Sequence, residues 1–214
     1  MNHENKTANF SDVPKDSEFT GYIAALVDAG AVQGYAGGTF RPRNDIKRSH
    51  AAKIITKVFG LEIGTLKANF LDLPSDPVLA NAINVLASNG IVKGYDNGNY
   101  FRPDDYTNRA QFAKMLCIAI VVASVQKAEA LHTPDAISEA QSNVDSLSDT
   151  QDADTTAFLR ARLDALKEGA GEGPTPTIYT VVFDKNGGAG DDMANLFFVY
   201  GVAQPLSANT YTRT

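Results

Sequence analysis

The side chains best suited to binding chemistry in this sequence are two arginines, Arg48 and Arg109, each predicted to stand at the start of a helix. A guanidinium can hold a carboxylate through two parallel hydrogen bonds, and the first turn of a helix adds exposed amides and a positive dipole end. This combination predicts two sites for anionic groups. A structural role is also open, in which each arginine pairs with an aspartate of the next unit and holds the units together.

Residues for catalysis or metal binding are not grouped in this way. The histidines His3, His50 and His132 are far apart and lack the spacing of metal ligands. In DKNGGAGDD, Gly188 and Asn195 stand where a calcium loop needs other ligands, so we interpret this segment as a hairpin turn. The sequence has no nucleophile–base pairing, phosphate loop or dinucleotide motif. We therefore expect no enzyme, no metal and no cofactor.

The composition is that of an ordinary acidic globular protein. Hydrophobic residues make up 43% of 214 residues, and the net charge of -6 argues against nucleic acid as a partner. The longest apolar run, Met115 to Val125, is about half of the ~20 residues that span a bilayer, so we predict no membrane insertion. We place this run on the buried face of a helix. The single cysteine, Cys117, is expected to be buried with it.

The elements that must position the arginines belong to a tandem repeat with an offset of about 60 residues. The segment that begins at Phe10 aligns with the segment that begins at Phe70. Phe10, Asp12, Ile23, Leu26, Gly30, Gly34 and Tyr35 recur as Phe70, Asp72, Ile83, Leu86, Gly90, Gly94 and Tyr95. Phe40, Arg41, Pro42, Arg48 and Lys53 recur as Phe101, Arg102, Pro103, Arg109 and Lys114. Chance does not produce so many matches in one order.

Each repeat is predicted to fold as helix, loop and helix. Ile23 and Leu26 have helical spacing, and Gly30 stands where a helix end needs positive φ. The loops GYAGGTFRP and GYDNGNYFRP predict tight turns, and Asp45 and Thr107 are candidate N-caps of the second helices. Those helices are predicted to bury Ile54, Ile55 and Val58 in the first repeat, and Phe112, Met115, Leu116 and Ile120 in the second.

Beyond the repeats we predict a helical hairpin and a small β segment. Apolar residues from Ile137 to Leu147 and from Phe158 to Leu166 have helical spacing, and GAGEGPTPT is a linker. Ile178 to Phe183 and Leu196 to Tyr200 predict two strands. The fold class is therefore mainly α with a partial β segment. The predicted parts are a tail (1–9), two repeats (10–66 and 67–127), a helical hairpin spacer (128–168), a linker (169–176) and the β segment (177–214).

The repeated motif resembles the S-layer homology (SLH) module. The resemblance rests on Phe-x-Asp-Val/Leu, Ile-x-x-Leu-x-x-x-Gly, Gly-Tyr-x-x-Gly and Phe-Arg-Pro, and covers about residues 10 to 122. It implies an α-helical fold that holds a surface protein to secondary cell-wall polysaccharide, often through pyruvylated sugars. It also implies an extracellular, cell-wall or S-layer location in a Gram-positive bacterium. The first residues, MNHENKTANF, contain no signal segment, so a signal would be removed or lie outside this chain.

The resemblance makes the two anion sites candidate glycan sites for a pyruvyl ketal or another acidic substituent. Arg48 and Arg109 are then the principal anchors, with tyrosines to stack on sugars and glycines to allow close approach. The tyrosines can equally pack in the loop, and the glycines can serve the backbone alone. We interpret Arg41 and Arg102 as structural. The candidate glycan-binding residues are Arg48, Arg109, Lys47, Lys93, Gln111, Phe19, Gly30, Gly90, Gly34, Gly94, Tyr35 and Tyr95.

Departures from the family pattern leave other functions open. Where the family has Thr-Arg-Ala-Glu, this chain has KRSH at 47–50 and NRAQ at 108–111, and it has no tryptophan. One alternative is a self-assembling scaffold whose repeats have lost glycan binding and whose open β segment pairs between chains. Another is a targeting module for an enzyme elsewhere in the protein. The segment from Ile178 resembles a Listeria–Bacteroides type surface repeat, a β-grasp-like module whose closing strand would follow Thr214.

Overall fold

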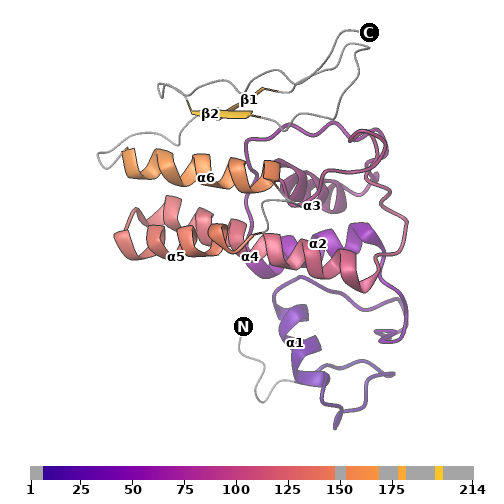
Figure 1. Cartoon of the computed structure of the whole chain (residues 1–214). Coiled ribbons are helices and arrows are strands. Elements are labelled where there is room, and N and C mark those ends of the chain that lie inside the picture. Colours follow the sequence, from indigo (N-terminus) through magenta and orange to yellow (C-terminus); the bar gives the residue numbers. More distant parts are fainter. Residues whose placement is uncertain (1–6, 148–152, 169–177, 182–195, 200–214) are drawn as a thin grey trace. The chain divides into compact units, whose positions relative to one another are not determined.

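A computed structural model describes residues 7–147, 153–168, 178–181 and 196–199 of the chain (Figure 1). The prediction of a mainly α protein is confirmed for these residues. The chain divides into two compact units, one of residues 1–63, 68–87 and 92–119, and the other of residues 64–67, 88–91 and 120–214. The elements are α1 (Thr20–Asp28), α2 (Arg48–Phe59), α3 (Pro77–Ser88), α4 (Arg109–Leu131), α5 (Pro134–Asp145), α6 (Ala153–Glu168), β1 (Ile178–Val181) and β2 (Leu196–Val199).

The helix ends of the two repeats follow from a few residues. α1 and α3 are each followed by a glycine in the left-handed region, Gly30 at φ 65° and Gly90 at φ 73°, as the sequence predicts. The N-cap predictions for the second helices were wrong. Lys47 precedes α2 without a side-chain cap, because an ammonium has no acceptor for the backbone amides, and it is extended there in a bridge to Tyr106. Asn108 precedes α4 and exchanges two hydrogen bonds with Gln111, which is a capping box.

The core of the first unit lies between the helices of the two repeats. α2 contacts α3 through the Thr56 hydroxyl, which donates to the carbonyl of Ala82 at 3.4 Å. Their fully buried side chains include Ile55, Ile83 and Leu86. Burial of these residues gives the unit most of its stability, at about 25 cal/mol per Å² of apolar surface.

Two burial predictions for α4 were wrong. Cys117 is exposed, and Ile120 is 51% exposed. The reason is the length of the apolar run. Ten of the eleven residues from Met115 to Val125 are apolar, and such a run passes around the whole circumference of a helix, so some of them must face away from the core. The buried members include Met115, Ile118 and Val122.

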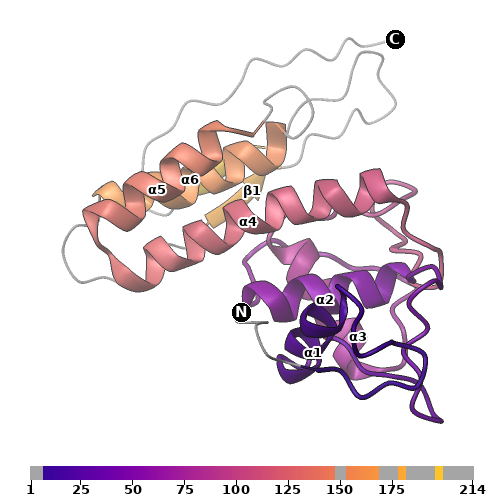
Figure 2. The same ribbon diagram turned by 90° about the horizontal axis from the view of Figure 1, so that it is seen from below.

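The second unit contains the predicted helical hairpin and strand pair. α5 begins with Thr133 as N-cap, whose hydroxyl accepts from the amide of Ala136, and α5 and α6 lie side by side (Figure 2). The buried residues between them confirm the apolar stripes. β1 pairs with β2 in antiparallel register, with Ile178 opposite Val199. The predicted turn and the linker (169–176) lie outside the described residues. The buried stripe includes Ala140, Val144, Phe158, Leu159 and Leu163.

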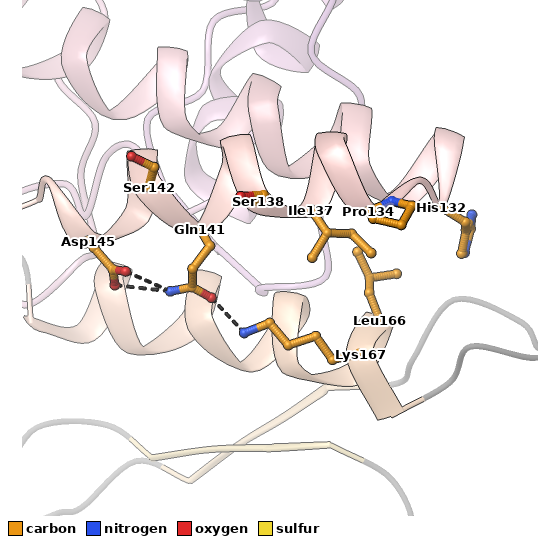
Figure 3. A pocket seen from close by; sticks show the side chains of 9 residues that line it. All are labelled: His132, Pro134, Ile137, Ser138, Gln141, Ser142, Asp145, Leu166 and Lys167. Carbon is orange, nitrogen blue, oxygen red and sulfur yellow. Dashed lines mark hydrogen bonds between the residues drawn. The ribbon is translucent and has the colours of Figure 1, made fainter.

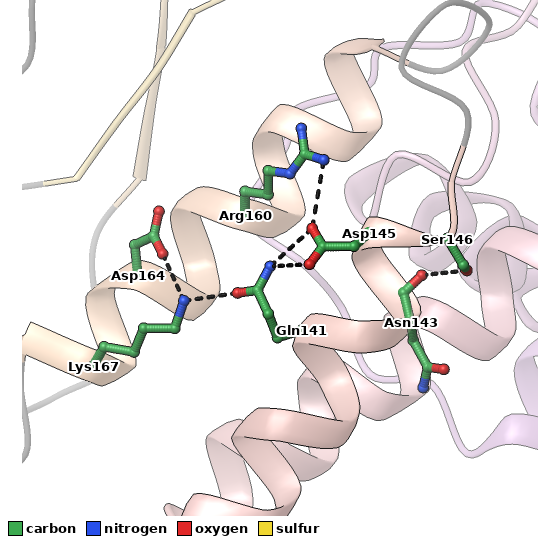
Figure 4. A network of polar contacts seen from close by, with 7 residues as sticks. All are labelled: Gln141, Asn143, Asp145, Ser146, Arg160, Asp164 and Lys167. Carbon is green, nitrogen blue, oxygen red and sulfur yellow. Dashed lines mark hydrogen bonds and ion pairs between the residues drawn. The ribbon is translucent and has the colours of Figure 1, made fainter.

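Exposed polar side chains also join α5 to α6 (Figure 4). The Gln141 amide donates to the Asp145 carboxylate at 3.0 and 3.1 Å, and the Lys167 ammonium donates to the Gln141 oxygen at 2.7 Å. Lys167 also pairs with Asp164, and Arg160 with Asp145. Because these groups are in water, each pair contributes at most about 1 kcal/mol. No helix among the described residues has the length and apolar content to cross a bilayer.

Candidate glycan-binding site

Each repeat shapes its glycine-rich loop around one aspartate. In the first repeat the amides of Phe40 and Arg41 each donate to one oxygen of Asp12 at 2.7 Å. The second repeat has the same arrangement around Asp72, at 2.8 and 2.7 Å. The Phe40 amide is the main reason that the pKa of Asp12 is lowered. Sequence reasoning had given these aspartates no role, although their recurrence with Phe-Arg-Pro was the available signal.

The loops bonded to Asp12 and Asp72 each hold one arginine in an unusual backbone conformation. Arg41 has φ 60° and Arg102 has φ 61°, in the left-handed region that side chains with a Cβ seldom occupy. Their guanidinium groups lie over tyrosine rings, Arg41 at 4.2 Å from the centroid of Tyr35 and Arg102 at 4.4 Å from that of Tyr95. Strain of this kind persists where the surroundings enforce it, often at functional sites. Each repeat therefore presents an arginine–tyrosine pair on its loop.

The two arginine–tyrosine pairs differ in what else they contact. Arg102 forms an ion pair with Asp96 at 3.0 Å, whose hydrogen bond raises the pKa of Arg102. The first repeat has Ala36 at the corresponding position, so Arg41 lacks a counterpart of Asp96. Tyr35 keeps 44% of its surface exposed. The pair in the first repeat is therefore better placed to take a ligand.

Arg48 is not at the surface but in the contact between the repeats. It is only 7% exposed, its Nε donates to the carbonyl of Phe101 at 3.0 Å, and its guanidinium lies over the rings of Phe101 and Tyr95 at 4.8 and 5.0 Å. Burial lowers the pKa of Arg48, as expected of a cation removed from water. This is a structural role like the alternative considered above, with a carbonyl in place of an aspartate.

The amides at the start of α2 are also taken. Arg48 N donates to the carbonyl of Asp105 at 2.8 Å, and Ser49 N donates to that of Pro103 at 3.1 Å. Lys47 forms an ion pair with Asp104 at 2.6 Å, and this hydrogen bond raises the pKa of Lys47. The first turn of α2 is thus filled by the second repeat's loop.

The remaining predicted site residues are scattered. Gln111, besides capping α4, donates to the hydroxyl of Tyr95 at 3.3 Å. A Cβ on Gly34 or Gly94 would meet the ring of Phe10 or Phe70, so close ring packing explains both glycines. Gly90 lies in the second unit, where its carbonyl accepts from the Thr155 hydroxyl. Arg109, Lys93 and Phe19 are exposed.

A groove in the first unit brings three of the predicted residues together. It has a volume of about 630 Å³ and is bounded by the first loop, α2 and the start of α3, with Gly30, Gly34 and Tyr35 in its wall. Its charged and polar lining was missed at the sequence level. The signal was present, because three of these residues lie at i, i+3 and i+7 on α2 and so share one face. The missed residues are Arg41, Asn44, Asp45, His50, Lys53, Lys57 and Asp76.

A second hollow, of about 810 Å³, lies on the helical hairpin of the second unit (Figure 3). Its wall combines Ile137 and Leu166 with Gln141, Asp145 and Lys167, whose polar atoms bond to one another. Those mutual bonds leave it less suited than the groove to an acidic ligand. No group of residues able to hold a metal ion occurs within the part of the chain that the structure describes.

Comparison with known proteins agrees with this organisation. Residues 9–52 and 69–113 each match the model of the S-layer homology domain family. An S-layer protein of Bacillus anthracis is 34% identical over 119 residues, which are 52% of this chain and 13% of that protein. The surface-layer 125 kDa protein of Lysinibacillus sphaericus is 37% identical over 94 residues, 44% of this chain and 8% of that protein.

Two further relatives differ in what their names describe. A cellulosome-anchoring protein of Acetivibrio thermocellus is 36% identical over 86 residues, 38% of this chain and 19% of that protein. An uncharacterized cell wall amidase of Bacillus anthracis is 34% identical over 100 residues, 44% of this chain and 18% of that protein. The chain thus spans less than a fifth of the length of each of these relatives.

The family match falls on the two repeats and not on residues 177–214, so the Listeria–Bacteroides type repeat stays a prediction. The two matched segments agree with the two repeats of the structure, each of which has a loop formed around an aspartate, Asp12 or Asp72. Both repeats of this chain therefore match the S-layer homology domain, and this similarity indicates a surface location in the cell wall or S-layer.

Proposed function

We propose that this chain anchors a surface protein non-covalently to an acidic secondary cell-wall polysaccharide, and that the groove beside α2 is the binding site. The S-layer and cellulosome-anchoring relatives support a non-enzymatic structural role of this kind, although one relative carries the name of an amidase. The observation that carries the proposal is the lining of the groove. It combines an exposed aromatic ring with several cations in a chain whose net charge is -6.

The lining suits an acidic sugar in its chemistry. Arg41, Lys53 and Lys57 supply three basic side chains, and a guanidinium can hold a carboxylate through two hydrogen bonds. The two carboxylates in the wall are Asp45 and Asp76, and Asp76 is used to cap α3 by accepting from the amide of Val78 at 2.8 Å. A sugar ring can pack on Tyr35 while its acidic substituent, such as a pyruvyl ketal, meets the cations.

Removing two groove cations is expected to weaken binding at least about tenfold, since a charge-assisted hydrogen bond contributes roughly 1.5–3 kcal/mol. The variant is Arg41→Ala/Lys53→Ala. The measurement is co-sedimentation with purified Gram-positive cell-wall sacculi, before and after removal of the secondary polysaccharide. The wild-type chain should pellet only when the polysaccharide is present.

The second repeat offers a matched control. Arg102→Ala/Lys114→Ala removes the residues that correspond to Arg41 and Lys53 in the repeat, and neither lines the groove. Binding by the control should stay within about twofold of wild type, because Arg102 is engaged by Asp96. If both variants pellet like wild type, or if the folded wild-type chain stays in the supernatant, the groove is not the anchor.

Binding is expected to strengthen as the pH falls from about 7.5 to about 5, through His50. Burial is the largest cause of its lowered pKa, followed by Lys47 and Lys53, while Asp76 and Asp104 act in the opposite direction. His50 is therefore neutral at pH 7, and protonation adds a cation to the groove. In the chain without glycan, the unfolded state binds this proton more readily than the folded state. The free energy of unfolding therefore falls as the pH drops below 6.5, the ordinary pKa of histidine.

The control for this pH dependence is His50→Gln, which keeps a polar side chain without a titratable ring. Polysaccharide binding by this variant should lose the severalfold rise toward pH 5 and keep the affinity measured at pH 7.5. An equal rise in both proteins would assign the pH effect to other groups.

A further inference from the structure

The contact between the two repeats has a donor side and an acceptor side. The donor side is the start of α2, residues 47–49, which we call the helix-start surface. The acceptor side is the loop of residues 101–106, which we call the docked loop. The principal bonds run from Arg48 and Ser49 to carbonyls of the docked loop, with lengths of 2.8 to 3.1 Å. Three of them start from Arg48 Nε, Arg48 N and Ser49 N and end at Phe101, Asp105 and Pro103.

Both sides of this contact occur a second time in the chain, and there neither side makes the corresponding contact with any segment that the structure describes. By the repeat alignment, residues 108–110 correspond to the helix-start surface and residues 40–45 to the docked loop. Arg48 is 7% exposed, whereas Arg109 is exposed. Phe101 is fully buried, whereas Phe40 is only half-buried.

We propose that the loop of residues 40–45 of one copy docks on residues 108–110 of a second copy, repeating between molecules the contact seen within one. In this arrangement Arg109 Nε donates to the carbonyl of Phe40, and Arg109 N to that of Asn44. The amide of Ala110 donates to the carbonyl of Pro42. The acceptors are all backbone carbonyls, so these bonds do not depend on the differences in side chains between the loops.

The side chains that do differ are compatible with docking and make it weaker. The ion pair of Lys47 with Asp104 is replaced by Asn108 facing Arg43, a neutral group against a cation, so no repulsion arises. Ala110 lacks the hydroxyl with which Ser49 donates to Pro103 at 2.9 Å. Association should therefore depend on concentration.

The contact uses a different surface on each partner, which defines a head-to-tail mode of assembly. A heterologous contact of this kind builds open chains unless its rotation happens to close a ring. This surface is distinct from the β segment for which self-association was predicted from the sequence. It also goes beyond the proposed glycan function, because it concerns contact between copies of this chain. Most of residues 40–45 also line the groove, so a second copy and the glycan compete for this loop.

Disulfide trapping tests the register of the contact. Within one chain Lys47 and Tyr106 form an isolated antiparallel bridge, a spacing that a disulfide can span. The corresponding intermolecular pair is Asp45 with Asn108. In a Cys117→Ser background, mixing the full-length Asp45→Cys and Asn108→Cys chains under mild oxidation should give mainly the mixed disulfide dimer. Lys47→Cys/Tyr106→Cys should close within one chain and serves as the positive control.

Sedimentation velocity over a concentration series tests the energetics. Wild type should shift to larger species as concentration rises, and Arg109→Ala should weaken this association at least tenfold while keeping the wild-type circular dichroism. Two results would overturn the proposal. One is a chain that stays monomeric and traps no mixed dimer while the intrachain control closes. The other is an association that Arg109→Ala leaves unchanged, which would point to another surface such as the β segment.

Discussion

Replacing Arg48 with alanine is expected to lower the free energy of unfolding of the repeat unit by about 2–4 kcal/mol. The side chain is almost fully buried, donates to the carbonyl of Phe101 and packs against the rings of Phe101 and Tyr95. Truncation leaves a cavity and an unpaired buried carbonyl, and removes two cation–π contacts. Urea unfolding followed by circular dichroism measures the change.

Arg109→Ala is the matched control, because it removes the same residue type from the corresponding position of the second repeat. Arg109 is exposed, so the control should change stability by less than about 0.5 kcal/mol. Arg48→Lys should lower the free energy of unfolding by an intermediate amount, since an ammonium lacks the planar group that stacks on the two rings. Equal effects of Arg48→Ala and Arg109→Ala would show that the buried contact does not support the fold.

This difference between two arginines in one motif shows what the sequence could not provide. The motif identifies Arg48 and Arg109 as equivalent, and local chemistry gives both the same capacity to bind an anion. Their environments diverge only because the loop that begins at Phe101 docks on α2, whereas no described segment docks in this way on α4. Which of two repeated surfaces is covered depends on contacts between repeats, and such contacts cannot be predicted from the sequence of one repeat.

Elements that depend on local pattern could be predicted well. The glycines after α1 and α3 marked both helix ends, and apolar spacing gave the α5–α6 hairpin and the positions of β1 and β2. Prediction failed for α4, where a continuous apolar run carries no information about which side faces the core. It failed also for the N-caps, because the bridge between Lys47 and Tyr106 decides where α2 begins.

The candidate site was predicted only in part for the same reason. Gly30, Gly34 and Tyr35 lie in one loop, and the sequence placed them together. The cations opposite them come from α2, and their shared face is visible in the spacing of His50, Lys53 and Lys57. The shape of the loop depends on the two bonds to Asp12, which join residues 28 and 29 positions apart and so are not part of any local pattern.

Removing Arg162 is expected to have the largest effect on the second unit. This arginine is 6% exposed and holds both oxygens of Glu129, at 2.7 and 2.5 Å, while also donating to the Asn89 side chain at 3.3 Å. Arg162→Ala leaves the Glu129 carboxylate without this partner and removes one of the hydrogen bonds to the Asn89 side chain, which keeps its bond from Gln126. Breaking a buried ion pair from one side costs about 3–5 kcal/mol. Thermal and urea unfolding of the full chain should show the loss as an earlier transition.

The control lies two residues away on the same helix. Arg160 pairs with Asp145 at 3.5 Å in water, so Arg160→Ala should lower stability by less than about 1 kcal/mol. A third variant, Arg162→Met/Glu129→Leu, removes both charges and should recover much of the stability lost by Arg162→Ala, because no lone charge stays buried. If the double variant is no more stable than Arg162→Ala, the loss comes from packing against Phe158 and not from the unpaired carboxylate.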